Sequence, residues 1–208
     1  ITRDGIRQIW PPMFQVRGQT LGLVGFGRIG RLIVPKAKGF DMRVIAYDPF
    51  VPADVFSSLD VESVTMDRLL SESDYVSINA SMTPGSEQMF GVQQFKQMKP
   101  TAYFINNARA QFVDEKALVE ALSSDTIAGA GLDVVEGERA LLDNPLLQLD
   151  NVVLTGHSAY YSEESSVMMR KRAYDMVGMV LKGGWPSMFI NPEVKDKYQQ
   201  RWGEVKSE

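Results

Sequence analysis

The chain has 208 residues, of which 44% are apolar and 23% are charged, a composition typical of a globular protein with one large domain. It has no cysteine and one histidine, which excludes a disulfide-stabilised secreted scaffold, a thiolate metal site and a multi-histidine metal centre, and we predict no bound metal. The 22 basic and 26 acidic side chains give a net charge of −4, so no broad basic surface is expected for nucleic acid.

Short apolar runs alternate with helical stretches along most of the chain. Strands are predicted over residues 21–24, 43–47, 75–78, 102–105, 128–132 and 151–154, and helices over 28–38 and 114–122. Pro35 lies inside the first of these helices, which we therefore expect to kink or to end early. Apolar runs separated by helices indicate buried parallel strands with crossover helices. The sequence therefore predicts an α/β fold with a doubly wound parallel sheet.

A last amphipathic helix is predicted over residues 162–181, with Gly183 and Gly184 ending it. Residues 185–208 have little periodic pattern, so we expect a tail that packs on another part of the protein or lies in solvent. At the other end, Pro11 and Pro12 block a continuous helix. The predicted organisation is an entering connection over residues 1–19, one domain over 20–182 and a tail over 183–208.

Gly25, Gly27 and Gly30 follow the first predicted strand and open the first predicted helix, the context that a dinucleotide-binding turn requires. The first glycine permits a tight turn, the second lets the backbone approach a pyrophosphate, and the third lets helix and strand pack closely. The helix N-terminus there would face the phosphate charge. A glycine-rich turn between a strand and a helix can also be purely structural, so the motif alone leaves both interpretations open.

Asp48 ends the second predicted strand, 18 positions after Gly30 and close to the spacing of about 20 expected for an acid that binds a ribose. A carboxylate there accepts hydrogen bonds from the ribose hydroxyls and repels a 2′-phosphate. We therefore expect NAD rather than NADP as the cofactor. The alternative is that Asp48 only caps the turn at Pro49.

Three polar side chains stand at the exits of later predicted strands: Arg109, Asp133 and His157. Ligands of open α/β sheets bind outside the carboxyl ends of the strands, so these side chains should face the same region as the glycine turn. Arg109 could hold an anionic substrate by a bidentate pair, and a carboxylate such as Glu138 beside His157 would suit the imidazole to proton transfer. The alternatives are a surface arginine, a packed or surface histidine, and a solvated acidic loop.

With these residues in order, the chain resembles the nucleotide-binding domain of the D-isomer-specific 2-hydroxyacid dehydrogenases. The similarity covers about residues 18–181. The segments that carry it are residues 18–30, 47–49, 106–109, 113–118, 131–134 and 151–157. Within the family, residues 157–164 are most similar to the branch of C-terminal-binding proteins, which includes transcriptional corepressors that sense NADH.

The resemblance implies a Rossmann-type sheet, NAD as cofactor and a set of site residues. The implied catalytic residues are Arg109, Glu138 and His157, and the implied substrate contacts are Arg109, His157 and Tyr160. Asp133 would anchor the nicotinamide. The full set of implied cofactor contacts is Gly25, Phe26, Gly27, Arg28, Ile29, Gly30, Asp48, Ala80, Ser81, Ser86, Asn107, Ala108, Arg109, Asp133, His157 and Ala159.

Two hypotheses about function follow from the resemblance. In the first, the chain is the NAD-binding domain of an oxidoreductase that transfers a hydride between the nicotinamide and a small 2-hydroxy or 2-oxo acid. In the second, it is a regulatory module that senses NAD(H) and signals by dimerisation or partner contact. Both branches carry the same trio, so the sequence leaves both open. The family's N-terminal substrate domain has no counterpart in these 208 residues, so we expect little turnover by this chain alone.

We also expect a cytoplasmic protein with no membrane partner and no direct nucleic-acid partner. The apolar runs are shorter than the roughly 18 residues that span a bilayer, and residues 1–20 lack the pattern of an export signal. A homodimer through this domain is predicted, because adaptable apolar side chains could form its interface. The alternative is that the same side chains line the core; they are Met66, Met82, Met89, Met98, Phe90, Phe95 and Phe112.

Overall fold

The structure, a computed structural model, describes residues 14–137 and 143–203. The chain divides into two compact units, Ile1–Ala159 and Tyr160–Glu208. The first unit contains the sheet and every predicted site residue except Tyr160, and the second unit contains the C-terminal helices.

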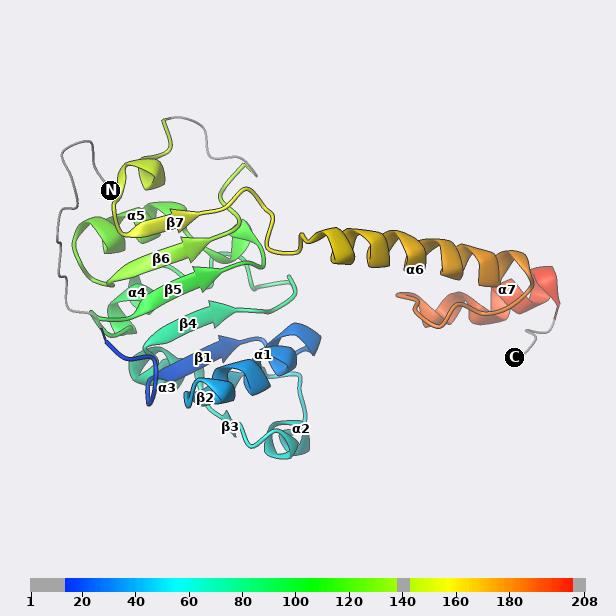
Figure 1. The fold of residues 1–208 in the computed structure, drawn as a ribbon, viewed down its shortest axis with the longest axis horizontal. Helices are drawn as coiled ribbons and strands as arrows, with labels where there is room; N and C mark the ends of the chain where they lie inside the picture. The colour runs from blue at the N-terminus through cyan, green and yellow to red at the C-terminus, as the bar shows by residue number, and fades with distance from the viewer. Residues whose placement is uncertain (1–13, 138–142, 204–208) are drawn as a thin grey trace. The chain divides into compact units, whose positions relative to one another are not determined.

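The first unit is built on one sheet of seven parallel strands in the order β3-β2-β1-β4-β5-β6-β7 (Figure 1). The chain starts in the middle of the sheet, runs outward to β3, returns to pair β4 with β1, and then adds strands toward β7. The doubly wound parallel sheet predicted from the sequence is therefore confirmed. The strands are β1 (Thr20–Val24), β2 (Arg43–Tyr47), β3 (Glu62–Ser63), β4 (Tyr75–Ile78), β5 (Tyr103–Asn106), β6 (Gly129–Leu132) and β7 (Val152–Leu154).

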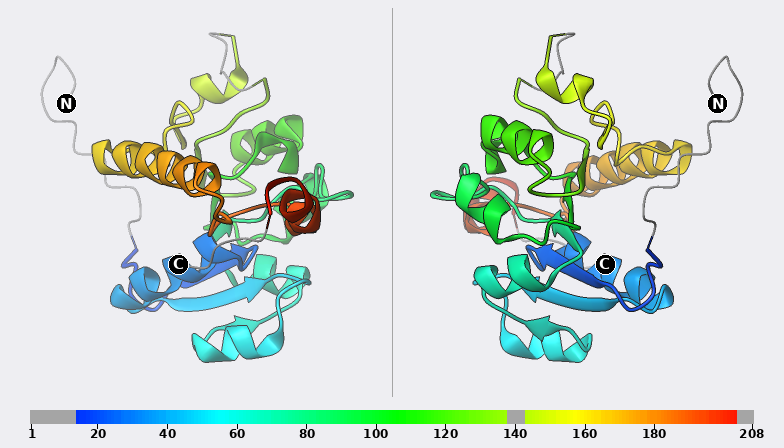
Figure 2. Two further views of the ribbon diagram at one scale, coloured as in Figure 1. Left: turned by 90° about the vertical axis from the view of Figure 1, so that its right-hand side faces the viewer. Right: turned by 90° about the vertical axis from the view of Figure 1, so that its left-hand side faces the viewer.

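Helices cover both faces of this sheet, as the two views in Figure 2 also show. In Figure 1, α1 lies in front of the strands and α3, α4 and α5 lie behind them. Asp114 caps α5, since its side chain accepts hydrogen bonds from the backbone N–H groups of Lys116 and Ala117. The helical elements of this unit are α1 (Arg28–Gly39), α2 (Ala53–Ser58), α3 (Met66–Glu72), α4 (Val92–Gln97), α5 (Glu115–Ser123) and the 3₁₀ turns η1 (Ala110–Phe112) and η2 (Pro145–Gln148).

The alternation of side chains along the strands creates two separate cores. In β2, Val44 and Ala46 pack toward one face and Ile45 toward the other, as the period of two in a strand requires. The smaller core joins β1 and β2 to α1 and α2, and Phe26 stacks on Phe56 there with ring centroids 4.5 Å apart. The larger core joins the central strands to α3, α4 and α5. Strands buried on both faces explain the continuous apolar runs in the sequence.

The first helix was predicted to kink or to end early at Pro35, and the early end is wrong. Helix α1 continues past Pro35 to Gly39. Proline removes one backbone N–H, whose partner four residues earlier would be the carbonyl of Arg31. Arg31 is exposed, so water can satisfy that carbonyl, and the loss is confined to one hydrogen bond.

The second unit contains α6 (Glu163–Leu181), η3 (Pro192–Val194) and α7 (Lys195–Trp202). Ser162 caps α6, since its hydroxyl accepts a hydrogen bond from the Ser165 N–H, and the tail packs back on the end of that helix. The Tyr198 hydroxyl bonds to the carbonyls of Val180 and Gly184. The centroids of the Trp185 and Tyr198 rings lie 5.4 Å apart. The tail therefore has a helix where the sequence showed little periodicity. In the described part of the chain, no helix is long and apolar enough to span a membrane.

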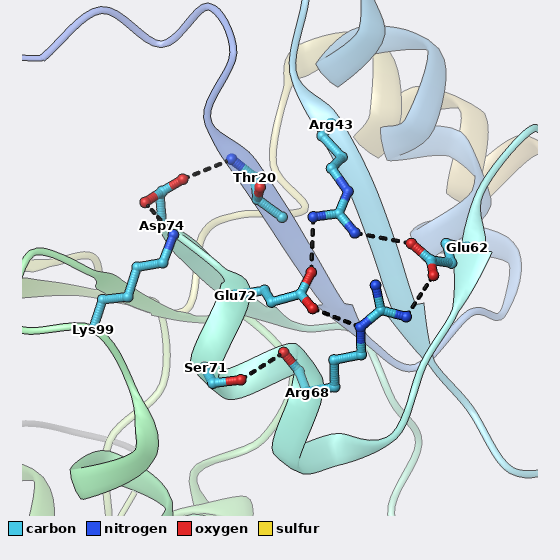
Figure 3. Close-up of polar contacts among 8 residues, drawn as sticks. All are labelled: Thr20, Arg43, Glu62, Arg68, Ser71, Glu72, Asp74 and Lys99. Carbon is cyan, nitrogen blue, oxygen red and sulfur yellow. Dashed lines mark hydrogen bonds and ion pairs between the residues drawn. The ribbon is translucent and has the colours of Figure 1, made fainter.

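A charged network lies at the amino ends of β2 and β3 (Figure 3). Arg43 pairs with Glu62 and Glu72, and Arg68 pairs with the same two carboxylates. Hydrogen bonds from Arg68 and then Arg43 lower the pKa of both glutamates. A lowered pKa means that the network stabilises the fold above the ordinary pKa of a glutamate and loses that contribution as pH falls through the lowered value. The groups are exposed, so the contribution is small.

A second polar cluster in Figure 3 ties the middle strands together. The Asp74 carboxylate accepts a hydrogen bond from the backbone N–H of Thr20 at 2.8 Å and pairs with the Lys99 ammonium at 2.8 Å. The carbonyl of Asp74 also accepts from the N–H of Tyr103. Asp74 thus joins the starts of β1, β4 and β5. Both polar clusters lie at the amino ends of the strands, which leaves the carboxyl ends for the site.

Candidate functional site

The glycine turn after β1 has a different steric requirement at each glycine. Gly25 has φ of +91°, and a Cβ there would lie 2.5 Å from the backbone N of Ala80. A Cβ on Gly30 would lie 2.5 Å from the carbonyl O of Gly25, whereas a Cβ on Gly27 would meet open space. Gly25 and Gly30 are therefore needed by the fold itself, and the open backbone at Gly27 is free for close approach by a ligand.

Asp48 follows β2 directly and stands beside the glycine turn. Its Oδ2 accepts a hydrogen bond from the Phe26 N–H at 2.8 Å, and its Oδ1 accepts from the Phe50 N–H at 3.0 Å. Asp48, Gly25 and Gly27 line one cavity of about 370 Å³. The fold thus brings together the two motifs that the sequence analysis singled out. Each carboxylate oxygen has a second lone pair that can accept from a ligand hydroxyl.

Phe26 does not line that cavity. Its side chain is fully buried in the smaller core, and its N–H is already donated to Asp48. The predicted contact between Phe26 and the cofactor therefore has no support in the geometry. The side chain holds the glycine turn against α2 instead, through its stack on Phe56.

The segment after β4 forms another wall of the same cavity. Ala80, Ser81 and Ser86 line it, as do Pro84 and Gly85. The Ser86 hydroxyl accepts from the Thr83 N–H and donates to the Thr83 carbonyl. Proline followed by glycine with φ of +85° is the pattern of a type II turn. The Ser86 hydroxyl is thus engaged in closing this turn, which fixes the wall.

Arg109 and His157 line a second cavity, of about 590 Å³, together with Glu87 and Glu136. Both side chains are exposed, and the Arg109 guanidinium donates to the Ala108 carbonyl. The fold therefore brings the predicted arginine and histidine to one cavity, although they lie far apart in the sequence.

Arg109 also lines a third cavity, of about 400 Å³. Arg28 stands at the first position of α1, on an exposed surface next to the glycine turn. The predicted cofactor contacts that line the third cavity are Ile29, Ala80, Ser81, Asn107 and Ala108, and Ala80 and Ser81 line the first cavity as well. Arg109 is therefore the side chain that borders both the predicted cofactor contacts and the cavity of His157.

Asp133 organises the loop that carries His157. Its carboxylate accepts from the Thr155 hydroxyl and from the N–H groups of Ser158 at 2.7 Å and Ala159 at 3.0 Å, and its carbonyl accepts from the His157 N–H. Burial by itself raises the pKa of the Asp133 carboxyl, but these hydrogen bonds together outweigh it and hold the pKa below its usual value. His157 has φ of +54°, a left-handed conformation that the surrounding bonds maintain.

Glu138, the predicted third member of the trio, lies outside the described residues. The Glu115 carboxylate, at the start of α5, accepts hydrogen bonds from one residue before Glu138 in the sequence and from one after it. Its Oε2 accepts from the Glu136 N–H at 2.8 Å, and its Oε1 accepts from the Asn144 amide at 2.9 Å. Tyr160, the remaining predicted substrate contact, belongs to the second unit. Its role stays a prediction.

The apolar side chains proposed for a dimer interface belong to the core. Phe90, Phe95, Phe112 and Met98 are at most 4% exposed, and the other methionines of that set pack partly buried against the same core. Phe90 and Phe95 pack against each other and against Phe104 of β5, and periodicity within short segments does not reveal such contacts. The interpretation as an interface is therefore wrong for these four buried side chains, whereas for Met66, Met82 and Met89 it stays a prediction, as does the homodimer.

The positions of Phe50, the Thr83–Ser86 turn and Glu115 near these cavities were not predicted from the sequence. The pair Pro84-Gly85 was a readable turn signal, but nothing in the sequence shows that the turn faces the glycine motif. Taken together, the open backbone at Gly27, the carboxylate of Asp48 and the cavities on either side of the turn fit a dinucleotide. Among the described residues, no group of three His, Cys, Asp or Glu side chains could hold a metal ion.

Comparisons with known proteins agree with this geometry. Residues 2–159 match the family described as D-isomer specific 2-hydroxyacid dehydrogenase, NAD binding domain. A glyoxylate reductase from Korarchaeum cryptofilum is 42% identical over 189 residues, which are 89% of this chain and 57% of that protein. A D-3-phosphoglycerate dehydrogenase from Methanocaldococcus jannaschii is 37% identical and is covered to 36% of its length.

Solved structures give the same result. The NAD-complexed form of a D-isomer specific 2-hydroxyacid dehydrogenase from Lactobacillus delbrueckii ssp. bulgaricus superposes with a TM-score of 0.80 at 35% identity, over 88% of this chain and 60% of that one. D-lactate dehydrogenase with NAD⁺ from Lactobacillus jensenii superposes with a TM-score of 0.78 at 29% identity, over 85% of this chain and 57% of that one. This chain thus spans between 36% and 60% of the length of these four relatives.

Proposed function

Because the chain belongs to the NAD-binding domain family of the D-isomer-specific 2-hydroxyacid dehydrogenases, we propose that it forms the cofactor-binding half of an oxidoreductase acting on a small 2-hydroxy or 2-oxo acid. One observation carries the proposal. The glycine turn and Asp48 share one cavity, Arg109 and His157 share another, and Arg109 also borders the predicted cofactor contacts. This arrangement supports a cofactor site next to a cation and a proton donor, which reduction of a 2-oxo acid requires.

The roles of the side chains follow from their chemistry. When bound, NADH supplies the hydride that a 2-oxo acid receives at its carbonyl carbon. Arg109 binds the substrate carboxylate, because a planar guanidinium matches it in two hydrogen bonds. His157 donates a proton to the carbonyl oxygen and takes it back in the reverse direction. We assign Glu138 on the resemblance alone, as the carboxylate partner of His157 in proton transfer.

We further propose that Asp133 keeps His157 in position, since it bonds to the loop both before and after that residue. The organisation with a connection over residues 1–19, a dinucleotide-binding domain over 20–182 and a tail over 183–208 belongs to the same proposal. So do a cytoplasmic location and a homodimer.

We expect the 208-residue chain to bind NADH and yet to reduce pyruvate, glyoxylate and hydroxypyruvate near the background rate. Arg109 and His157 are exposed, and catalysis needs the reacting atoms held within roughly 3 to 3.5 Å. The measurement is NADH consumption at 340 nm, with a longer polypeptide that supplies a substrate-binding domain as the positive control. Fast reduction by the 208-residue chain would show that it contains the whole catalytic site.

We expect a preference for NADH over NADPH that depends on Asp48. Replacement by alanine removes hydrogen bonds to ribose hydroxyls, which should weaken NADH binding by about 1 to 3 kcal/mol, and it removes the charge that repels a 2′-phosphate. Fluorescence titration of both cofactors with the wild type and Asp48→Ala measures this. The exposed Asp54→Ala is the matched control. Equal affinities of the wild type for both cofactors would contradict the assignment.

A further inference from the structure

The cavity that Arg109 and His157 share is lined by more carboxylates than guanidinium groups. Its lining includes the Arg109 guanidinium and the carboxylates of Glu87 and Glu136. Within the described part of the chain, neither carboxylate takes part in an ion pair or a side-chain hydrogen bond, and Arg109 bonds only to the Ala108 carbonyl. Once a substrate carboxylate has neutralised Arg109, the two glutamates remain without a counter-charge.

The backbone segments that carry the two glutamates are held in place. The N–H of Gln88, next to Glu87, donates to the Gln111 carbonyl at 2.8 Å. The N–H of Glu136 donates to the Glu115 carboxylate, also at 2.8 Å. Both glutamate side chains are exposed, so a ligand can reach them from solvent. Charged groups on a fixed backbone lose less freedom when a ligand binds, which favours their use in binding.

The cavity is also larger than the smallest 2-oxo acids require. Its volume of about 590 Å³ falls within the roughly 300 to 1,000 Å³ of cavities that take drug-sized ligands. A 2-oxo acid of two or three carbons fills only a small part of such a volume. Val113, Val134 and Val135 line the cavity as well. An apolar lining of this kind suits an alkyl chain.

We propose that the substrate is a 2-oxo or 2-hydroxy acid whose side chain ends in a cation, an amino or a guanidino group, and that Glu87 and Glu136 select it. The inference rests on the proposed function, in which Arg109 binds the substrate carboxylate and His157 transfers the proton. The alkyl chain of the substrate lies along the valines, and its cationic end meets the two glutamates. The same glutamates repel an acid that ends in a second carboxylate.

The test compares three D-2-hydroxy acids of similar length that differ in the charge of the far end. They are 6-amino-2-hydroxyhexanoate, 2-hydroxyheptanoate and 2-hydroxyhexanedioate, which end in a cation, a methyl group and an anion. Each is titrated against the ¹⁵N-labelled chain saturated with NAD⁺, and binding is followed by NMR at Arg109 and His157. The wild type should bind the cationic acid best and the anionic acid worst.

Glutamine variants remove one charge at a time and keep the size of the side chain. Glu87→Gln and Glu136→Gln should each weaken binding of the cationic acid by about 1.5- to 5-fold, the range for one exposed ion pair, and the double variant by about 2- to 25-fold. Binding of the neutral acid should not change. Glu120→Gln, an exposed carboxylate of α5 outside the cavity, is the matched control and should bind all three acids like the wild type.

The outcomes separate the inference from the function on which it rests. Equal affinities of the wild type for the three acids, or a preference that neither glutamine variant reduces, overturn the role of the glutamates and leave Arg109 and His157 as the substrate site. An equal loss for all three acids in the variants overturns that role as well, because the glutamates would then only support the shape of the cavity. If none of the acids shifts the resonances of Arg109 and His157, the proposed substrate site itself is overturned.

Salt gives a readout that a purely structural role would not move. The preference for the cationic acid should decrease as the salt concentration is raised toward about 1 M, because salt screens exposed charges. A preference that salt leaves unchanged would contradict selection by charge.

Discussion

Replacement of Gly25 with alanine is expected to lower the free energy of unfolding by about 2 to 4 kcal/mol and to abolish NADH binding. The backbone there has φ of +91°, which an L side chain rarely adopts. The new Cβ would also lie 2.5 Å from the N and 2.6 Å from the Cα of Ala80, so β4 and the glycine turn would have to separate. Urea unfolding followed by circular dichroism and fluorescence titration of NADH measure the two effects.

Two other glycines serve as matched controls for Gly25. Gly27→Ala meets open space, so its stability should match the wild type while NADH binding falls, because the pyrophosphate would approach that backbone. Gly39→Ala, at the end of α1, also meets open space and should leave both quantities unchanged. Wild-type stability of Gly25→Ala would show that the turn is looser than the structure has it. Unchanged NADH binding by Gly27→Ala would place the pyrophosphate elsewhere.

Replacement of Asp133 with alanine is expected to release the loop that carries His157. Three hydrogen bonds to one buried carboxylate are lost, which should lower the free energy of unfolding by about 1 to 3 kcal/mol. The amide hydrogens of Ser158 and Ala159 should exchange at least about tenfold faster, because the loop can then open without breaking hydrogen bonds to Asp133. Hydrogen exchange followed by NMR and urea unfolding are the measurements.

The charge of Asp133 gives this prediction a pH dependence. Because its pKa is lowered in the folded state, the carboxylate stabilises the loop above the ordinary pKa of an aspartate, and that contribution disappears as pH falls through the lowered value. The difference in the free energy of unfolding between the wild type and Asp133→Ala should therefore become smaller at acid pH. Asp150→Ala, an exposed carboxylate, is the control and should behave like the wild type. Equal exchange rates in Asp133→Ala and the wild type at neutral pH would show that other contacts hold the loop.

The sheet could be predicted from the sequence because its strands are buried on both faces. Residues 43–47 and 75–78 were predicted with the bounds of β2 and β4, since a continuous apolar run needs no partner to be recognised. Helices α2 and α4 were not predicted, because six residues are too few to show a helical period. The two-residue strand β3 is polar and exists only because β2 pairs with it.

The site could be predicted only in part. Arg109, Asp133 and His157 come after strands, and parallel strands bring their carboxyl ends to one edge, so their proximity follows from the order of elements alone. Phe50 is different: an aromatic residue in a turn gives no sequence signal of being exposed. The burial of Phe26 was equally hidden, because its partner Phe56 lies on a helix that the sequence did not reveal.

The return of the chain from β3 to β4 has a consequence for folding. Thr20 and Asp74, which bond at the junction of β1 and β4, are 54 residues apart, roughly twice the distance between paired residues of β1 and β2. Doubling a loop adds about 0.6 kcal/mol of closure entropy, and no contact of β4 with β1 offsets it until the ends have met. The strands β1 to β3 can assemble locally, and so can β4 to β7. The crevice for the dinucleotide comes into existence only when these two halves join, so the rate of that joining sets how soon a newly made chain can hold its cofactor.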